Sequence, residues 1–196
     1  QGCVPLVVNF QDQSLNASGW QWAIAGDTVL SQQLDYTFGI PDTSFMVELI
    51  VDTAGFCFDT ATVQIDLASP PLANFSKAWD QFCDIPALNS FMDLSQSTRP
   101  VLYRWEFGDG GNAVVPNPNY VYQTTGIFPV SLEVINDFNC RDTLMDTVRV
   151  YPQPQASIQA SPQRGCAPLA VQFLNQSQQY SRSLWDFGDN LSLIHI

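Results

Sequence analysis

The stretch Gly2-Cys-Val-Pro-Leu-Val-Val-Asn-Phe-Gln-Asp-Gln-Ser14 returns near the other end of the chain as Gly165-Cys-Ala-Pro-Leu-Ala-Val-Gln-Phe-Leu-Asn-Gln-Ser177, and most positions carry the same residue. A looser copy, with one residue inserted, runs from Cys83 to Ser95. Self-similarity at a fixed period is typical of tandem structural units. The repeat therefore decides the architecture of this 196-residue chain.

A second motif follows each copy of the first. It reads Trp105-Glu-Phe-Gly-Asp-Gly110 in the middle of the chain, Trp185-Asp-Phe-Gly-Asp-Asn190 near the end and, in eroded form, Trp22-Ala-Ile-Ala-Gly-Asp27. Trp105 and Phe107 alternate, as do Trp185 and Phe187, so each pair points to one face of a strand. We expect that face to be the core.

The end of this motif, Gly108-Asp109-Gly110, is a turn signal. Glycine allows a positive φ, and an Asp side chain accepts backbone N–H bonds in an Asx-turn. Gly188 and Asp189 are the matching residues of the last copy. We interpret Asp109 and Asp189 as turn caps; the alternative is weak Ca²⁺ coordination by loop carboxylates and carbonyls. No other metal or cofactor is expected.

Long alternating segments complete each unit. Gly126-Ile-Phe-Pro-Val-Ser-Leu-Glu-Val134 alternates apolar and polar residues with period two, which predicts a half-buried strand. Phe45-Met-Val-Glu-Leu-Ile-Val51 matches it 83 positions earlier, and Cys57 and Cys140 are separated by the same 83 positions. No helical period is present, so the sequence predicts an all-β unit of about 80 residues.

Two proline-marked joints, residues 68–72 and 151–155, separate the copies. Such joints are semi-rigid because proline fixes φ. We expect repeat 1 at 1–68, which is degenerate, repeat 2 at 72–152 and a truncated repeat 3 at 156–190. The tail 191–196 matches no other copy and resembles a translated sequencing-adapter end, so we set it aside, His195 included.

Composition excludes several function classes. The net charge is −12, with 19 acidic and 7 basic residues, so the basic patch that nucleic acid requires is missing. His195 is the only histidine, which excludes a Ser-His-Asp triad and an HExxH zinc site, and we expect no enzyme. No apolar run is long enough to cross a membrane. The chain begins at Gln1, so we expect a piece of a longer protein.

The five cysteines occupy repeat positions. Cys3, Cys83 and Cys166 open the three copies, and Cys57 and Cys140 precede the last strand of the first two. One of each kind per complete copy predicts the disulfides Cys3–Cys57 and Cys83–Cys140, with Cys166 unpaired, and an oxidising compartment. Each bridge would contribute at most about 4 kcal/mol in the chain-entropy model.

The two motifs resemble those of the PKD domain family. Its Pro-Leu-x-Val-x-Phe strand matches Pro168 to Phe173, and its Trp-x-Phe-Gly-Asp segment matches Trp105 to Asp109 and Trp185 to Asp189. The resemblance implies tandem immunoglobulin-like β-sandwiches, two complete copies and a truncated third, in an extracellular protein. It makes Trp22, Trp105 and Trp185 core residues and leaves an exposed role open only for Trp20 and Trp79.

Taken together, these features predict a non-catalytic, semi-rigid spacer in a large secreted or cell-surface protein, of bacterial type. The resemblance implies contacts to proteins or glycans at the cell surface. The alternative is an accessory module that holds a polymeric substrate for a secreted polysaccharide- or protein-degrading hydrolase.

Overall fold

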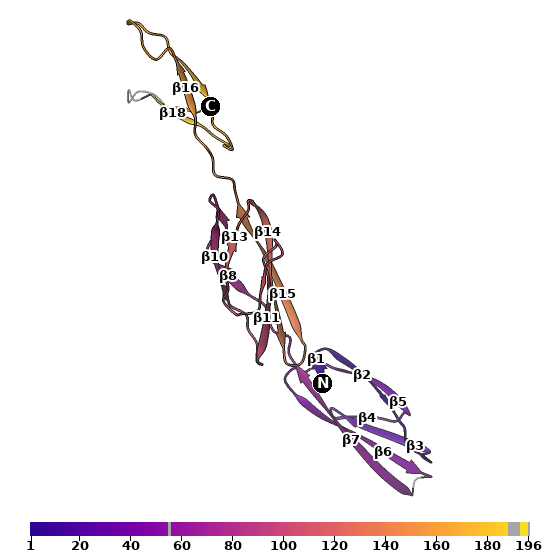
Figure 1. Cartoon of the computed structure of the whole chain (residues 1–196). Coiled ribbons are helices and arrows are strands. Elements are labelled where there is room, and N and C mark those ends of the chain that lie inside the picture. Colours follow the sequence, from indigo (N-terminus) through magenta and orange to yellow (C-terminus); the bar gives the residue numbers. More distant parts are fainter. Residues whose placement is uncertain (55, 188–192, 196) are drawn as a thin grey trace.

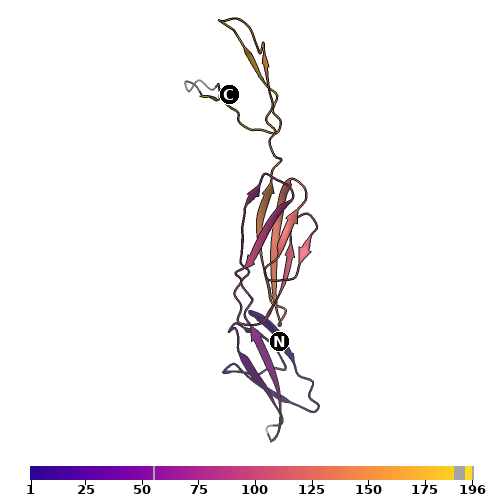
Figure 2. The same cartoon turned by 60° about the vertical axis from the view of Figure 1, so that its left-hand side comes forward.

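The computed structural model describes residues 1–54, 56–187 and 193–195. Within these residues every regular element is a strand. Two β-sandwich modules and a smaller third segment follow one another along an elongated molecule (Figure 1), and a second view shows the same serial arrangement (Figure 2). This confirms the predicted all-β fold of tandem immunoglobulin-like sandwiches.

Module 1 comprises a five-stranded sheet in the order β1-β7-β6-β3-β4 and the two-stranded sheet β2-β5. The short strand β1 runs parallel to β7, whereas all other pairs are antiparallel. Its strands are β1 (Gly2–Cys3), β2 (Leu6–Gln11), β3 (Gly19–Ile24), β4 (Asp27–Val29), β5 (Gln33–Phe38), β6 (Ser44–Thr53) and β7 (Cys57–Ala68).

Module 2 repeats this topology. Its five-stranded sheet has the order β12-β11-β14-β15-β9, in which each strand corresponds to one of module 1, and β13-β10-β8 forms the opposite sheet. Its strands are β8 (Phe75–Lys77), β9 (Gln81–Phe82), β10 (Ala87–Asp93), β11 (Val101–Glu106), β12 (Asn112–Ala113), β13 (Asn119–Tyr122), β14 (Gly126–Asn136) and β15 (Arg141–Val150).

The third segment contains two separate strand pairs, β16-β17 and β18-β19. Its strands are β16 (Ile158–Ser161), β17 (Gln172–Asn175), β18 (Leu184–Asp186) and β19 (Leu193–His195). The tail that we set aside thus supplies β19, which pairs with the Trp185 strand. Phe173 and Leu184 remain largely exposed, so the segment buries little apolar surface.

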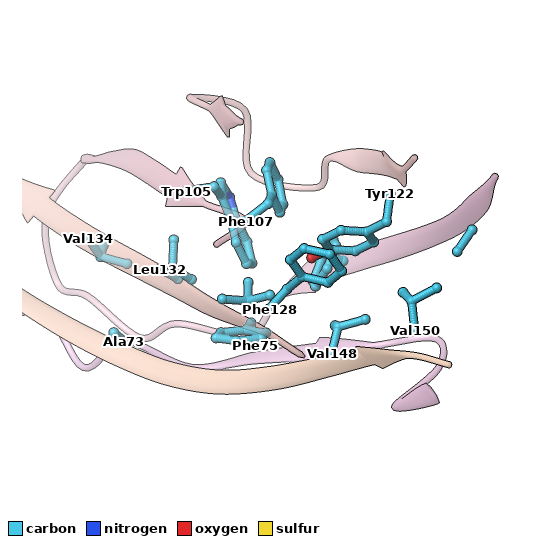
Figure 3. Close-up of a cluster of buried hydrophobic side chains, with 13 residues drawn as sticks. Ala73, Phe75, Trp105, Phe107, Tyr122, Phe128, Leu132, Val134, Val148 and Val150 are labelled. Atoms are coloured by element: carbon cyan, nitrogen blue, oxygen red, sulfur yellow. The ribbon is translucent and has the colours of Figure 1, made fainter. Parts of the chain in front are cut away.

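The core of module 2 lies between its two sheets (Figure 3). Alternation along β14 turns one face inward, and β11 and β10 add aromatic rings from either side. All six side chains that we predicted for this core are buried together in it: Phe91, Trp105, Phe107, Val130, Leu132 and Val134. Module 1 has a separate, smaller core around Trp22 and Phe38.

The serine that ends the first motif closes a turn in every copy. The backbone N–H of Ser95 donates to Asp93 Oδ1 at 2.9 Å, and Ser14 and Ser177 make the same bond to Asp12 and Asn175. The Ser95 hydroxyl also accepts the backbone N–H of Asn74. The repeated serine therefore holds the end of the β10 strand against the chain that enters the module.

Replacing Trp105 by alanine should lower the free energy of unfolding of module 2 by roughly 3–5 kcal/mol, because the side chain is fully buried and a cavity remains. Trp79→Ala is the matched control, since Trp79 is 63% exposed and should change stability little. Thermal or urea unfolding measures both. Equal effects of the two substitutions would contradict the core assignment.

Ending the chain after Gln155 should leave the unfolding temperature of module 2 unchanged. The strands of the third segment pair only with one another and extend neither sheet of module 2. Calorimetry of residues 1–155 beside the full chain measures this. A fall of several degrees would show that the third segment stabilises module 2 and that the modules are not independent.

Candidate functional site at the module junction

The Phe-Gly-Asp-Gly turn of module 2 is a structural cap. Gly108 has φ +86°, and a Cβ there would lie 2.6 Å from the carbonyl oxygen of Pro129, so only glycine fits. Asp109 Oδ1 accepts the backbone N–H of Gly111 at 3.0 Å and the hydroxyl of Tyr120 at 2.7 Å. The predicted Asx-turn is therefore present, with a tyrosine that the sequence did not point to.

The environment of this turn shifts the pKa of Tyr120. Burial and the hydrogen bond to the Asp109 carboxylate raise it to about 12.

In the described part of the chain, no group of three or more His, Cys, Asp or Glu side chains is arranged to hold a metal ion. In the third segment, Trp185 and Phe187 stack on each other, but Trp185 is only half-buried and Phe187 is 41% exposed. The expectation that this pair lies in a core is therefore wrong for the third copy, whose few described strands form no sandwich around it. Gly188 and Asp189 lie outside the described residues.

The one disulfide among the described residues joins the two modules. It links Cys3 of module 1 to Cys140 of module 2, with their Cα atoms 5.5 Å apart. Cys140 is buried and lies at the tip of the β14-β15 hairpin, just before β15 begins. Figure 1 shows that this end of the hairpin meets β1. The covalent bond therefore crosses the junction instead of closing a loop within one module.

The predicted pairs Cys3–Cys57 and Cys83–Cys140 do not form, because the two cysteines of each pair lie at opposite ends of a module. Cys3 is opposite Ala68 at the end of β7, whereas Cys57 begins that strand of 12 residues, so about 36 Å of strand separates them. In module 2, Phe82 pairs with Val150 at the end of β15, about 33 Å from Cys140. A disulfide requires Cα atoms within about 7 Å.

Three cysteines are free and exposed, namely Cys57, Cys83 and Cys166.

Hydrogen bonds fix the linker, residues 69–72, to module 2. The side chain of Asn136 donates to the carbonyl of Ser69 at 3.0 Å, while its Oδ1 accepts the N–H groups of Phe138 and Cys140. Leu72 and Gln96 exchange backbone hydrogen bonds at 2.8 and 2.9 Å. A single buried asparagine thus holds both the hairpin tip and the linker.

Charged side chains add a second set of contacts at the junction, some across it and some within module 2. Asp42 of module 1 accepts hydrogen bonds from the N–H and hydroxyl of Ser69 and, at 3.2 Å, from the hydroxyl of Thr98 in module 2. Arg99 makes a bidentate pair with Asp137 and lies 4.1 Å from the ring centroid of Phe138. None of these residues belongs to a repeat motif, so sequence reasoning missed them.

Hydrogen bonds and an ion pair near the junction lower the pKa of three carboxyls. The backbone N–H of Ser69 holds the pKa of Asp42 below its ordinary value, a hydrogen bond from Ser44 does so for Asp66, and Arg99 does so for Asp137. A carboxyl whose pKa is lowered on folding stabilises the folded state fully at a pH above the ordinary pKa of 3.8. This contribution is lost as the pH falls through the lowered pKa. The junction network is therefore intact at neutral pH.

The PKD domain family model matches residues 69–150, which contain module 2. No match was found among curated proteins. No helix of the described residues is long and apolar enough to cross a membrane.

Several solved structures are similar to this chain or to parts of it. The PKD1 domain of Vibrio anguillarum Epp is 27% identical, with a TM-score of 0.38, over 42% of this chain and 95% of that one. The PKD1 domain of the Vibrio cholerae metalloprotease PrtV is 24% identical, with a TM-score of 0.37, over 41% and 96%. A structure from a 1.5-MDa bacterial ice-binding adhesin is 10% identical, with a TM-score of 0.37, over 80% and 62%.

Two neighbouring tyrosines should respond differently to replacement by phenylalanine. The buried hydroxyl of Tyr122 has no hydrogen-bond partner among the described residues, so Tyr122→Phe should be neutral or stabilising. Tyr120→Phe removes the bond to Asp109 and should cost about 1–3 kcal/mol. Urea unfolding of the two variants measures the difference. A larger loss for Tyr122→Phe would contradict the assigned hydrogen bonds.

Proposed function

We propose that this chain, whose residues 69–150 form a PKD domain, is a non-catalytic spacer in a secreted or cell-surface protein. The observation that carries the proposal is the Cys3–Cys140 bond, which joins neighbouring modules covalently at a second point besides the linker. A disulfide of this kind persists in an oxidising, extracellular compartment.

Two connections restrict the angle between the modules far more than one. The linker alone is a Pro-Pro spacer of four residues. It is semi-rigid, but as a single connection it still permits one module to rotate relative to the other. The disulfide, the hydrogen bonds of Asn136 and the contacts of Asp42 act at separate points around the junction. We infer that modules 1 and 2 move as one stiff unit that sets the distance between whatever the chain connects.

The same mechanical property serves an adhesive protein or the accessory module of a secreted hydrolase, which differ only in what the spacer holds apart. For direct contact with proteins or glycans, we propose Trp79. Trp79 is 63% exposed, whereas the other candidate, Trp20, is half-buried and donates to Asp12 at 2.6 Å. An exposed indole offers an apolar face that can stack on a sugar ring or a peptide side chain.

The chain offers its own probes of stiffness, because Cys57 and Cys83 are free, exposed and placed in different modules. Spin labels on these two thiols, with Cys166→Ser, should give a narrow distance distribution. Adding Cys3→Ser with Cys140→Ser should widen it by roughly twofold, since the linker is then the only covalent connection. Pulsed electron paramagnetic resonance measures the width. An unchanged distribution would show that the disulfide does not stiffen the junction, and the spacer mechanism would be wrong.

A further inference from the structure

The two modules carry their cysteines at equivalent places. Cys57 and Cys140 lie at the tip of the last hairpin, β6-β7 in module 1 and β14-β15 in module 2. Cys3 and Cys83 lie at the opening strands β1 and β9, which run parallel to the end of the last strand. The observed bond therefore joins an opening cysteine to the hairpin cysteine of the following module.

The equivalent hairpins differ in what covers them. The module 2 hairpin packs on module 1, and its Cys140 is 2% exposed. In module 1 the same hairpin ends in Cys57 and two phenylalanines, Phe56 at 87% and Phe58 at 65% exposure. Exposed aromatic rings beside a free thiol indicate a surface that a partner covers, since single modules seldom leave adjacent aromatic side chains in water.

We propose that Cys57 and Cys83 are half-sites for disulfides with further PKD-like modules. Cys57 accepts the opening cysteine of a module on its N-terminal side, and Cys83 accepts the hairpin cysteine of a module on its C-terminal side. The occupant is a module of the same repeat, because the one contact of this kind among the described residues, Cys3–Cys140, is made by two such modules. Successive modules then form a chain stapled at every junction.

Linker lengths agree with this rule. Ala68, at the end of β7, pairs with Cys3, and five residues later the chain reaches Ala73. At the second joint, Tyr151 and Ala156 are also five residues apart, and Ala73 and Ala156 are separated by the 83 positions that separate the hairpin cysteines. A complete module that starts at Ala156 therefore has the covalent spacing to bring its hairpin to Cys83.

Bond formation needs an oxidant, which we take to be a low-molecular-weight disulfide such as glutathione disulfide. The thiolate of one cysteine attacks the oxidant and releases one glutathione thiol, which gives a mixed disulfide. The second cysteine thiolate attacks that mixed disulfide and releases the other glutathione. Two protein thiols are oxidised to one disulfide, and the oxidant accepts their two electrons and two protons.

The test extends the full chain by one module. A second copy of residues 73–155 is inserted between Gln155 and Ala156, and Met92→Leu and Val114→Ile in that copy, both at exposed positions, mark its peptides by mass. After oxidation in glutathione buffer, free thiols are alkylated and disulfides are mapped by mass spectrometry. We expect Cys83 of the original module bonded to Cys140 of the inserted copy, with Cys3–Cys140 retained.

The matched control carries Cys140→Ser in the inserted copy alone, and it should leave the original Cys83 alkylated. A second variant tests Cys57. The same marked copy of residues 73–155 is placed ahead of Gln1, and a stretch with the sequence of residues 73–80 connects the two. This stretch lets the chain run along module 1, so that the added module can reach the hairpin tip. Its Cys83 should bond to Cys57.

Three outcomes would overturn the proposal: an alkylated Cys83 in a folded, extended chain, a Cys83–Cys140 bond within the inserted copy, or an inserted copy that stays unfolded although it has the sequence of module 2. The spacer proposal is tested separately, because it depends on the width of a distance distribution and not on which further cysteines pair.

Discussion

The long antiparallel hairpin of each module determines how the modules can be joined. In module 2, ten successive residue pairs from Gly126–Val150 to Ile135–Arg141 carry the chain from one end of the sandwich to the other. The hairpin tip therefore lies at the end that receives the linker, and the opening strand β9 lies at the opposite end, beside Val150. With this geometry, a cysteine at the tip can reach only the preceding module.

Features that depend on local sequence patterns could be predicted from the sequence, whereas features that depend on how the modules meet could not. Period-two alternation specifies an inward face, so residues such as Val130, Leu132 and Val134 could be assigned to the core before any topology was known. The turn at Gly108 and Asp109 could likewise be predicted, because positive φ and Asx capping are local properties.

The disulfide could not be predicted by the same reasoning, because it depends on which ends of the modules meet. Counting one opening and one hairpin cysteine per copy favours pairing within a copy, yet the alternating segments 45–51 and 126–134 already indicate strands about 20 Å and 26 Å long, well beyond the roughly 7 Å that a disulfide spans. That length was the missed signal. Asp42, Arg99 and Asn136 lie in loops and at a strand end, with no repeated pattern around them, so only the folded junction shows their role.

The magnitudes at the junction decide which contact matters most. The chain carries a net charge of −12, so neighbouring modules repel each other, although this repulsion decays within about 8 Å in physiological salt. An exposed ion pair such as Arg99–Asp137 is screened by solvent and contributes little to stability, and it lies entirely within module 2. Among the described residues, the hydrogen bonds at Asp42 and Ser69 and the disulfide do cross the junction directly.

Those hydrogen bonds exchange readily with water, whereas breaking the disulfide requires a reductant. Acid below the lowered pKa of Asp42 therefore weakens the Asp42 contacts and leaves the modules linked. A reductant at neutral pH leaves the Asp42 contacts and breaks the covalent bond that joins the modules at a second point besides the linker. The disulfide therefore holds module 1 on module 2 more firmly than the Asp42 contacts do, which is the property that the proposed spacer requires.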